Sequence, residues 1–287
     1  MSDSGQNSVI FRNGVRHLNG LFKGYYFKHQ KGEHTLCVIA GQSEDERFIQ
    51  VITKEFSRKV SFTQGNHFSM KGIVLNIHEP GLSLTGRIRY KNLTPIHYDV
   101  MGPFCLFPME CRHRIISMNH HLEGKVSFNG EIMDFTGGRG YIEGDSGRSF
   151  PSSYTWIQAN DFQDDCSIMA AVAKIPFCGL KFRGCICVIN DRGREYRLAT
   201  YLGVKILTCT KNNIILKQGK YRLDIRINAG KGHRLSAPQD GEMERTILET
   251  VSCPAEFLFF EGQRLIFYKK SEQASFEYEA AGRRGSG

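Results

Sequence analysis

Short segments rich in β-branched and aromatic residues recur along almost the whole chain, separated by Gly, Asn, Pro or clusters of charge. Such segments are typical of β-strands, and several alternate apolar and polar residues as in a sheet with one wet face. The clearest predicted strands are residues 25–27, 34–40, 47–52, 59–62, 73–77, 82–90, 114–118, 124–128, 131–135, 167–173, 184–189, 195–201, 205–209, 213–216, 221–227 and 256–260. Residues 241–251, with glutamates near their start, are the one segment predicted as a helix. The pattern predicts an all-β protein.

The strand pattern begins again near the midpoint of the chain. Residues 25–27 align weakly with 156–158, and residues 82–88 align with 221–227. A chain of 287 residues is long enough for two domains, each with its own core. We therefore predict two antiparallel β-barrels or sandwiches packed side by side. The expected division is a flexible arm (1–20), an N-terminal barrel (21–145), a C-terminal barrel (146–279) and a disordered tail (280–287).

The net charge of +9 allows attraction to nucleic acid, anionic lipid or an acidic substrate. Basic residues nevertheless occur in runs no longer than pairs such as Lys269–Lys270, and the aromatic and basic signatures of RNA-binding modules are absent. A solvated basic surface without a nucleic-acid partner is expected. The sequence also contains no phosphate loop, dinucleotide fingerprint or Gly-x-Ser-x-Gly elbow, so nucleotide use and ordinary serine hydrolysis are not expected.

The first residues lack the basic and apolar regions of a secretory signal, and no apolar run reaches the length of a membrane helix. Nine cysteines, odd in number and scattered, are typical of reduced thiols. These features predict a cytoplasmic protein.

Phe (20 residues) and Tyr (11 residues) are abundant, which suits a cavity for an apolar small molecule. Such a substrate would make transient contact with a membrane surface reasonable.

The stretch 136–162 gathers more functional side chains than any other. Glu143 and Asp145 are two positions apart, so in a strand they share one face. Two adjacent carboxyl groups repel when both are ionised, so one of them could hold a proton for general acid catalysis near neutral pH. Arg139 and Arg148 leave a structural alternative open, in which both carboxylates form salt bridges.

Trp156, Gln158 and Asn160 also alternate onto one face. An indole beside two amides is typical of a pocket that stacks on a ring and binds its oxygens, although a core role for Trp156 is an equal alternative. His120 could act as a base or merely be a buried, hydrogen-bonded histidine. No paired-Cys knuckle or His-Glu-x-x-His helix is present, so no metal site is expected. The apolar connection 92–109 is expected to cover or floor another part of the fold.

Residues 140–151, followed by 156–160, resemble the central signature of the tocopherol cyclase family. In that signature a Gly-Tyr-x-Glu-x-Asp-Trp-Gly-x-Ser-Phe-Pro run leads into Trp-x-Gln-x-Asn-His-Phe. Similar segments occur at 24–28, 110–113, 117–120 and 235–238. The chain differs from the family at four positions: Ser146 replaces Trp, Asp161 replaces His, and Lys23 and Tyr25 stand where Glu and Trp are usual.

The resemblance implies two lipocalin-like barrels and a cyclase reaction without a redox cofactor. In that reaction a side-chain alkene is protonated while a phenol oxygen attacks. Glu143 or Asp145 would be the proton source, Trp156 and Tyr141 would steady the developing cation, and Gln158 and Asn160 would hold the ring oxygens. The remaining predicted binding residues are Tyr25, His120 and Asp161.

Two functional hypotheses follow. The first is a cofactor-free cyclase, isomerase or hydratase acting on a prenylated or other apolar small molecule. The second is a non-catalytic binding protein of the same shape. A buried carboxyl group that lines an apolar cavity together with Trp156 would favour the enzyme.

Overall fold

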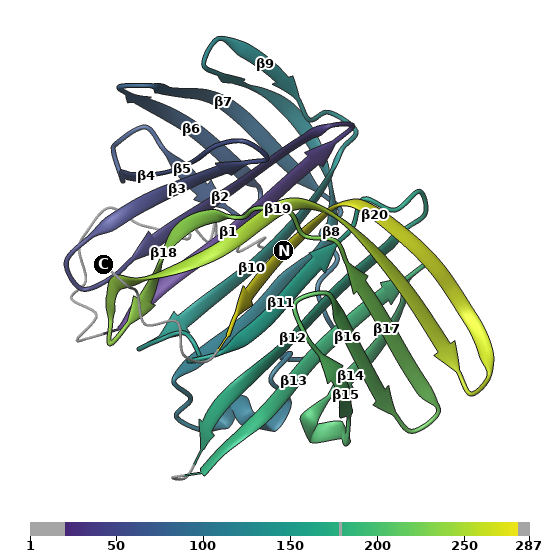
Figure 1. Ribbon diagram of the computed structural model, residues 1–287. Coiled ribbons are helices and arrows are strands. Elements are labelled where there is room, and N and C mark those ends of the chain that lie inside the picture. The colour runs from purple at the N-terminus through teal and green to yellow at the C-terminus, as the bar shows by residue number, and fades with distance from the viewer. Residues whose placement is uncertain (1–20, 178–179, 281–287) are drawn as a thin grey trace, which may run out of the picture.

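The computed structural model describes residues 21–177 and 180–280, which form two antiparallel sheets, each curled around its own apolar interior (Figure 1). We call these curled sheets the first and the second barrel. Each contains ten strands, so the all-β prediction is confirmed. The arm predicted at 1–20 and all but Ala280 of the predicted tail lie outside the described residues.

The first barrel contains the strands β1 to β10, with the short 3-10 helix η1 (Gly102–Leu106) between β7 and β8. Its strands are β1 (Phe22–Lys31), β2 (His34–Gln42), β3 (Arg47–Thr53), β4 (Ser57–Ser61), β5 (His67–Ser69), β6 (Gly72–Glu79), β7 (Leu82–Lys91), β8 (Cys111–Phe128), β9 (Glu131–Asp134) and β10 (Arg139–Gly147). They lie in the order β4-β3-β2-β1-β10-β8-β7-β6-β5, with β9 paired to β8. The first strand of the barrel therefore pairs with the last.

The second barrel contains β11 to β20, with the 3-10 helix η2 (Thr200–Leu202) after β14. Its strands are β11 (Tyr154–Ala159), β12 (Cys166–Phe177), β13 (Leu180–Asp191), β14 (Arg194–Ala199), β15 (Lys205–Cys209), β16 (Asn213–Gln218), β17 (Tyr221–Ile227), β18 (His233–Gln239), β19 (Glu242–Glu261) and β20 (Arg264–Glu279). The order β14-β13-β12-β11-β20-β19-β17-β16-β15 repeats that of the first barrel. The central stretch of the sequence therefore closes one barrel with β10 and opens the next with β11.

The segments that align within the sequence fall on equivalent strands. Residues 82–88 lie on β7 and residues 221–227 on β17, at corresponding places in the two sheets. Residues 25–27 lie on β1 and residues 156–158 on β11. Tyr26, and not Tyr25, packs with Trp156 between the barrels, so the alignment of this pair is out of register by one residue.

The helix predicted at 241–251 is wrong, because these residues lie in the loop before β19 and in its first half. Thr246, Ile247 and Val251 are β-branched, and the strand is paired on both sides, to β18 and to β20. The two strands predicted at 114–118 and 124–128 are one continuous strand, β8. The Asn129–Gly130 turn joins β8 to β9 with positive φ at both residues, as the sequence indicates for a tight hairpin.

Three apolar clusters hold the fold together. One fills the first barrel, one fills the second, and a third lies between them. The third cluster joins Tyr26, Met118 and Tyr141 of the first barrel to Trp156 and Ile247 of the second. Since a fully buried large apolar side chain contributes about 1.5–3 kcal/mol, this shared layer fixes the barrels against each other.

A buried lysine adds polar contacts to this interface. Lys28 of β1 is fully buried, and its Nζ donates to Gln158 Oε1 (2.9 Å) and to the backbone oxygens of Gln273 (2.8 Å) and Gln158 (3.5 Å). All three acceptors belong to the second barrel. Burial lowers the pKa of Lys28, and nearby acidic side chains oppose this effect.

The apolar connection 92–110 crosses from the first barrel to the second. Arg197 of β14 donates to the backbone oxygens of Asp99 (2.8 Å) and Tyr98 (3.0 Å), and Tyr201 donates to that of Val100 (3.0 Å). The Arg197 guanidinium also lies over the Tyr98 ring. The connection is thereby held where its apolar side chains reach the barrel interface, which confirms that it covers another part of the fold.

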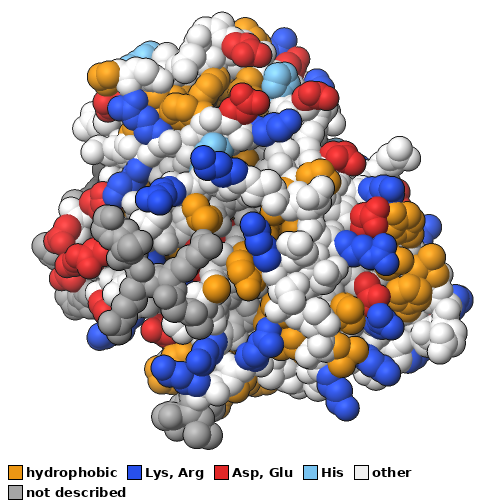
Figure 2. All heavy atoms as spheres, in the orientation of Figure 1, with side chains coloured by type: hydrophobic (Ala, Val, Ile, Leu, Met, Phe, Trp, Pro, Cys, Tyr) orange, Lys and Arg blue, Asp and Glu red, His pale blue; other side chains and the backbone are white. Residues whose placement is uncertain are grey.

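The face of the molecule drawn in Figure 2 carries charge without a single dominant patch. In the view of Figure 2, Lys and Arg side chains are dispersed and interspersed with acidic ones. Among the residues that the structure describes, no helix has the length and apolar character needed to cross a membrane. The cysteines of the described residues are all free thiols.

Candidate active site

A cavity of about 200 Å³ lies between the two barrels. Its walls are mainly apolar and come from both sheets and from the 92–110 connection. Residues that line it include Tyr26, Met101, Phe104, Tyr154, Trp156 and Ile247. An apolar cavity with a few polar groups is the usual form of a small-molecule site, so the polar groups in its wall decide its chemistry.

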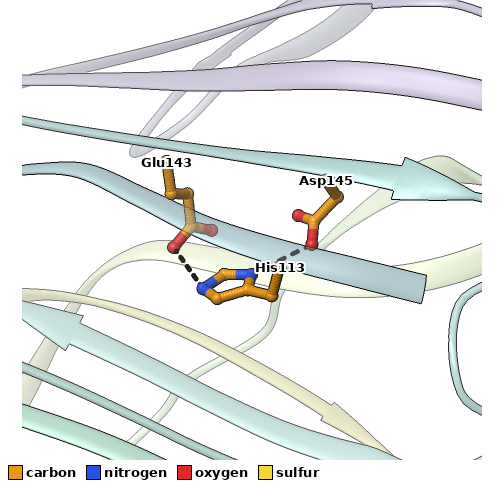
Figure 3. Close-up of side chains that lie close together, drawn as sticks. All are labelled: His113, Glu143 and Asp145. Atoms are coloured by element: carbon orange, nitrogen blue, oxygen red, sulfur yellow. Dashed lines mark hydrogen bonds and ion pairs between the residues drawn. The ribbon is translucent and has the colours of Figure 1, made fainter. Parts of the chain in front are cut away.

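His113, Glu143 and Asp145 form the main polar group of the cavity wall (Figure 3). Both carboxyl groups project from β10 on the same face, as their spacing predicts, and His113 projects from β8 directly opposite Asp145. His113 Nδ1 lies 2.9 Å from Asp145 Oδ1 in a hydrogen bond. His113 Nε2 lies 3.4 Å from Glu143 Oε2, an ion-pair contact without hydrogen-bond geometry. The imidazole thus stands between the two carboxyl groups.

Glu143 is held by groups from both barrels. The Tyr141 hydroxyl donates to Glu143 Oε2 (2.6 Å), and the Trp156 indole N–H of the second barrel donates to the same oxygen (3.2 Å). No described residue donates to Oε1, and the dashed contact to His113 in Figure 3 runs to the other oxygen, Oε2. One oxygen is therefore fixed by three contacts, and the other is available for a proton.

Burial raises the pKa of Glu143 from 4.5 to about 7, and the nearby Asp145 charge acts in the same direction. His113 and the two hydrogen-bond donors oppose this rise without cancelling it. Burial alone would lower the pKa of His113, but the carboxylates of Asp145 and Glu143 outweigh it and raise that pKa from 6.5 to about 9. Near neutral pH the site thus contains an imidazolium and a carboxyl group that titrates.

The salt-bridge alternative for the two carboxylates is not what the structure shows. Arg139 pairs with Asp165 at 3.4 Å. Across residues 21–177 and 180–280, the ion pairs of Glu143 and Asp145 involve only His113. His113, Glu143 and Asp145 are also the described residues whose ligand atoms lie close enough to hold a metal ion, within 4.8 Å of one another. A metal would first have to displace the proton of His113, since only neutral imidazole is a ligand.

Trp156, Gln158 and Asn160 share a face, as predicted, and that face is turned toward the first barrel. Of these three residues, Trp156 alone lines the cavity. Its ring packs edge-on against Tyr26, with the centroids 5.6 Å apart. Gln158 accepts the hydrogen bond from Lys28, and Asn160 Nδ2 donates to the backbone oxygen of Gly140 (3.0 Å). The two amides therefore contact the first barrel directly.

The other predicted binding residues lie in different surroundings. Tyr25 lines the cavity while packing with the core of the first barrel. His120 is buried beside Tyr90, with Nδ1 3.2 Å from Ser117 Oγ, and does not line the cavity. Asp161 accepts hydrogen bonds from Ser271 Oγ (2.5 Å) and from the backbone N–H groups of Glu272 (2.9 Å) and Gln273 (3.0 Å). Asp161 thus fixes a bend in β20.

Sequence reasoning missed His113, Tyr26 and Glu277, which are polar residues of the cavity wall. His113 lies in a segment that resembles the family, and its pairing with Asp145 is the signal that would have identified it. That pairing follows two irregularities in the β8–β10 register, so spacing in the sequence could not reveal it. Glu277 lies in the last strand, where no motif marks it.

The two barrels have the same strand order, and the apolar cavity between them contains carboxyl groups. These features define a class of two-domain β-proteins. The chain belongs to the tocopherol cyclase-like family, whose model matches residues 32–278. The family resemblance is thereby confirmed. No curated protein matches the sequence.

Solved structures show the same fold at low sequence identity. Kievitone hydratase from Nectria haematococca is 11% identical with a TM-score of 0.52, and the match covers 97% of this chain and 95% of that one. CghA, crystallised with Sch210972, is 7% identical with a TM-score of 0.59, covering 90% and 88%. These likenesses concern the architecture, and the chemistry has to be argued from this chain's own residues.

Proposed function

We propose that this protein catalyses a proton-transfer reaction, namely ring closure, isomerisation or hydration, on a prenylated or other apolar small molecule held between the barrels. The observation that carries the proposal is the carboxyl group of Glu143, which is buried in the wall of an apolar cavity beside Trp156. Membership of the tocopherol cyclase-like family supports this class of chemistry, and the hydratase activity named for kievitone hydratase, a protein of the same fold, agrees with it.

Glu143 is the proton donor in this mechanism. Its Oε1 hydroxyl protonates a substrate alkene, and the negative charge that develops on the carboxylate is stabilised by Tyr141, Trp156 and the His113 imidazolium. The faces of aromatic residues in the wall, Trp156 among them, attract the carbocation. A phenol oxygen of the substrate, or water, then attacks the cation.

The proton released by the attacking oxygen returns to Glu143, which restores the acid. Ring closure is therefore an isomerisation, and hydration adds one water, with no net consumption of protons. Asp145 does not transfer the proton in this scheme. It is a positioning residue that keeps His113 charged and fixed through the 2.9 Å hydrogen bond.

One observation favours the alternative, a non-catalytic binding protein for an apolar ligand. Asp161 stands where the family has His, and its carboxylate is fully engaged with β20. Ser146 stands where the family has Trp, so an aromatic side chain of the family is also missing. A protein that lost the groups for one reaction could retain the cavity and its ligand.

The two functions are separated by incubating the protein with a prenylated quinol and searching for the chromanol by mass spectrometry. Product that depends on Glu143 supports the enzyme, so Glu143→Gln should abolish it. Asp145→Asn should reduce it, and the exposed control Asp165→Asn should not change it. Product formed equally by Glu143→Gln would refute the assigned role. Binding of the quinol, seen as a change in Trp156 fluorescence, with no product would establish the binding protein instead.

A further inference from the structure

A further carboxyl group, that of Glu277 on β20, faces the same cavity from the opposite barrel. In the sheet, Glu277 pairs directly with Trp156 of β11 on one side and with Glu249 of β19 on the other. Directly paired residues project from the same face, so all three side chains point toward the first barrel. Trp156 and Glu277 line the cavity, whereas Glu249 does not.

The contacts of Glu277 define which of its atoms is free. The Tyr154 hydroxyl donates to Glu277 Oε2 (2.5 Å). Within the described part of the chain, Glu277 forms no ion pair and Oε1 receives no hydrogen bond. Its side chain is partly accessible and belongs to the cavity wall. Oε2 therefore accepts a hydrogen bond from Tyr154, and Oε1 can form a hydrogen bond with a bound molecule.

The surroundings of Glu277 favour its neutral form. Burial raises its pKa well above the usual value, and the neighbouring carboxyl groups of Glu249, Glu143 and Asp145 act in the same direction. The Tyr154 hydrogen bond opposes this rise only in part. A neutral carboxyl group whose Oε2 accepts from Tyr154 carries its hydroxyl on Oε1, where it is a hydrogen-bond donor.

We propose that Glu277 is the binding site for a neutral oxygen acceptor of the ligand, a carbonyl or an ether, which accepts a hydrogen bond from Glu277 Oε1. This inference rests on the proposed function and narrows it. The ligand class is an apolar skeleton with its reactive carbon near Glu143 and an oxygen acceptor at Glu277. Anionic ligands are disfavoured, because the cavity wall is mainly apolar and His113, one of its two cationic side chains beside Lys23, is already paired with Glu143 and Asp145.

The alternative is that Glu277 only completes the packing around Tyr154. If Glu277 has only a structural role, substituting it should change the affinity for all ligands of the cavity equally. If it donates a hydrogen bond to the ligand, the substitution should weaken only ligands that carry an acceptor. The distinction is therefore made with two probes of nearly equal shape that differ in a carbonyl group.

The probes are 2-propionylnaphthalene and 2-propylnaphthalene, with dissociation constants measured by equilibrium dialysis. Glu277→Met, which removes the donor and keeps most of the volume, should weaken ketone binding by about tenfold and hydrocarbon binding by less than about twofold. Glu277→Gln, whose amide can still donate, should retain part of the ketone affinity. The matched control Asp191→Asn, a buried carboxyl group of the second barrel outside the cavity wall, should leave the ratio of the two constants unchanged.

The wild-type protein gives an independent reading, which does not depend on the folding of any variant. The infrared carbonyl stretch of the bound ketone should lie below its frequency in hexane, because a hydrogen bond to the oxygen weakens the C=O bond. A hexane-like frequency, or an equal loss of affinity for both probes in Glu277→Met, overturns the role of Glu277 and leaves the proposed function standing. Failure of the wild-type protein to bind either probe would overturn the ligand class assigned here, whereas the proposed function is decided separately by the Glu143-dependent formation of chromanol.

Discussion

Replacing Asp145 by Asn tests the polar group of the cavity wall without any knowledge of the substrate. His113 has its pKa raised from 6.5 to about 9 by two carboxylates. Asp145 makes the closer contact, a 2.9 Å hydrogen bond, whereas Glu143 lies 3.4 Å away without hydrogen-bond geometry. Asp145 should therefore account for more than half of the increase in the His113 pKa. We expect Asp145→Asn to lower the His113 pKa by about 1–2, to between about 7 and 8.

The same change should alter how stability depends on pH. The folded-state pKa of His113 lies above its unfolded value, so its contribution to stability is complete below pH 6.5 and is lost as the pH rises through 9. The pKa of Glu143 is also raised, and the corresponding stability is lost between pH 4.5 and 7. Between pH 7.5 and 9.5 the wild type and the variant should differ mainly through His113, because the other titratable groups of the cavity wall are present in both proteins. Over this window the wild type should lose about 1–2 kcal/mol more unfolding free energy than Asp145→Asn.

The assay is an NMR titration of the histidine side chains, with exposed His67 as an internal reference, together with urea unfolding at pH 7.5 and 9.5. The double variant Glu143→Gln/Asp145→Asn should bring the His113 pKa below 6.5, because the effect of burial then dominates. A His113 pKa near 6.5 in the wild type, or one that Asp145→Asn leaves unchanged, would refute the charge arrangement on which the mechanism depends.

Three further predictions concern the framework around the site. Lys28→Met should destabilise the protein by about 1–3 kcal/mol in chemical unfolding, because acceptors of the second barrel lose their buried donor; an unchanged midpoint would contradict the bridging role. Arg197→Ala should speed hydrogen exchange in residues 98–104 while leaving the sheets protected, and uniform exchange across the protein would count against a local clamp. Gly41→Ala should cost about 1–3 kcal/mol, since the added methyl carbon would lie 2.2 Å from the Phe48 ring, whereas the control Gly24→Ala meets no atom closer than 3.9 Å. Equal stability of these two variants would contradict the packing described.

Much of the fold could be predicted from the sequence because most strands carry their own local signal. The helix predicted at 241–251 shows where that signal fails. Here the buried face of β19 carries Ile247, Glu249 and Val251, while Leu248 on the other face is only half-buried. An acidic residue inside and an apolar one outside disrupt the period of two in the sequence. The strand is instead established by tertiary contacts, namely its pairing with β18 and β20 and the hydrogen bond from Tyr26 to Glu249.

For the candidate site, the sequence could predict only how residues of the same strand lie relative to one another. The spacing of Glu143 and Asp145 places both on one face, and the structure confirms it. Their partner His113 depends on the register of β8 against β10, which irregularities in that pairing determine. The spacing predicts that Gln158 binds substrate, and it could not reveal that the amide accepts a hydrogen bond from Lys28 of the other barrel. Contacts between barrels depend on how two complete sheets pack, which no local pattern encodes.

The pairing of first and last strands in each barrel has an evolutionary consequence. The seams β1–β10 and β11–β20 both supply residues to the cavity, so each half of the chain meets the ligand where its own two ends join. A one-barrel ancestor with such a seam could pair with a second copy about a two-fold axis and enclose one cavity with two identical walls. Fusion of the two copies frees the walls to diverge. Here the two walls differ: one carries a histidine between two acids, and the other an acid held by a tyrosine.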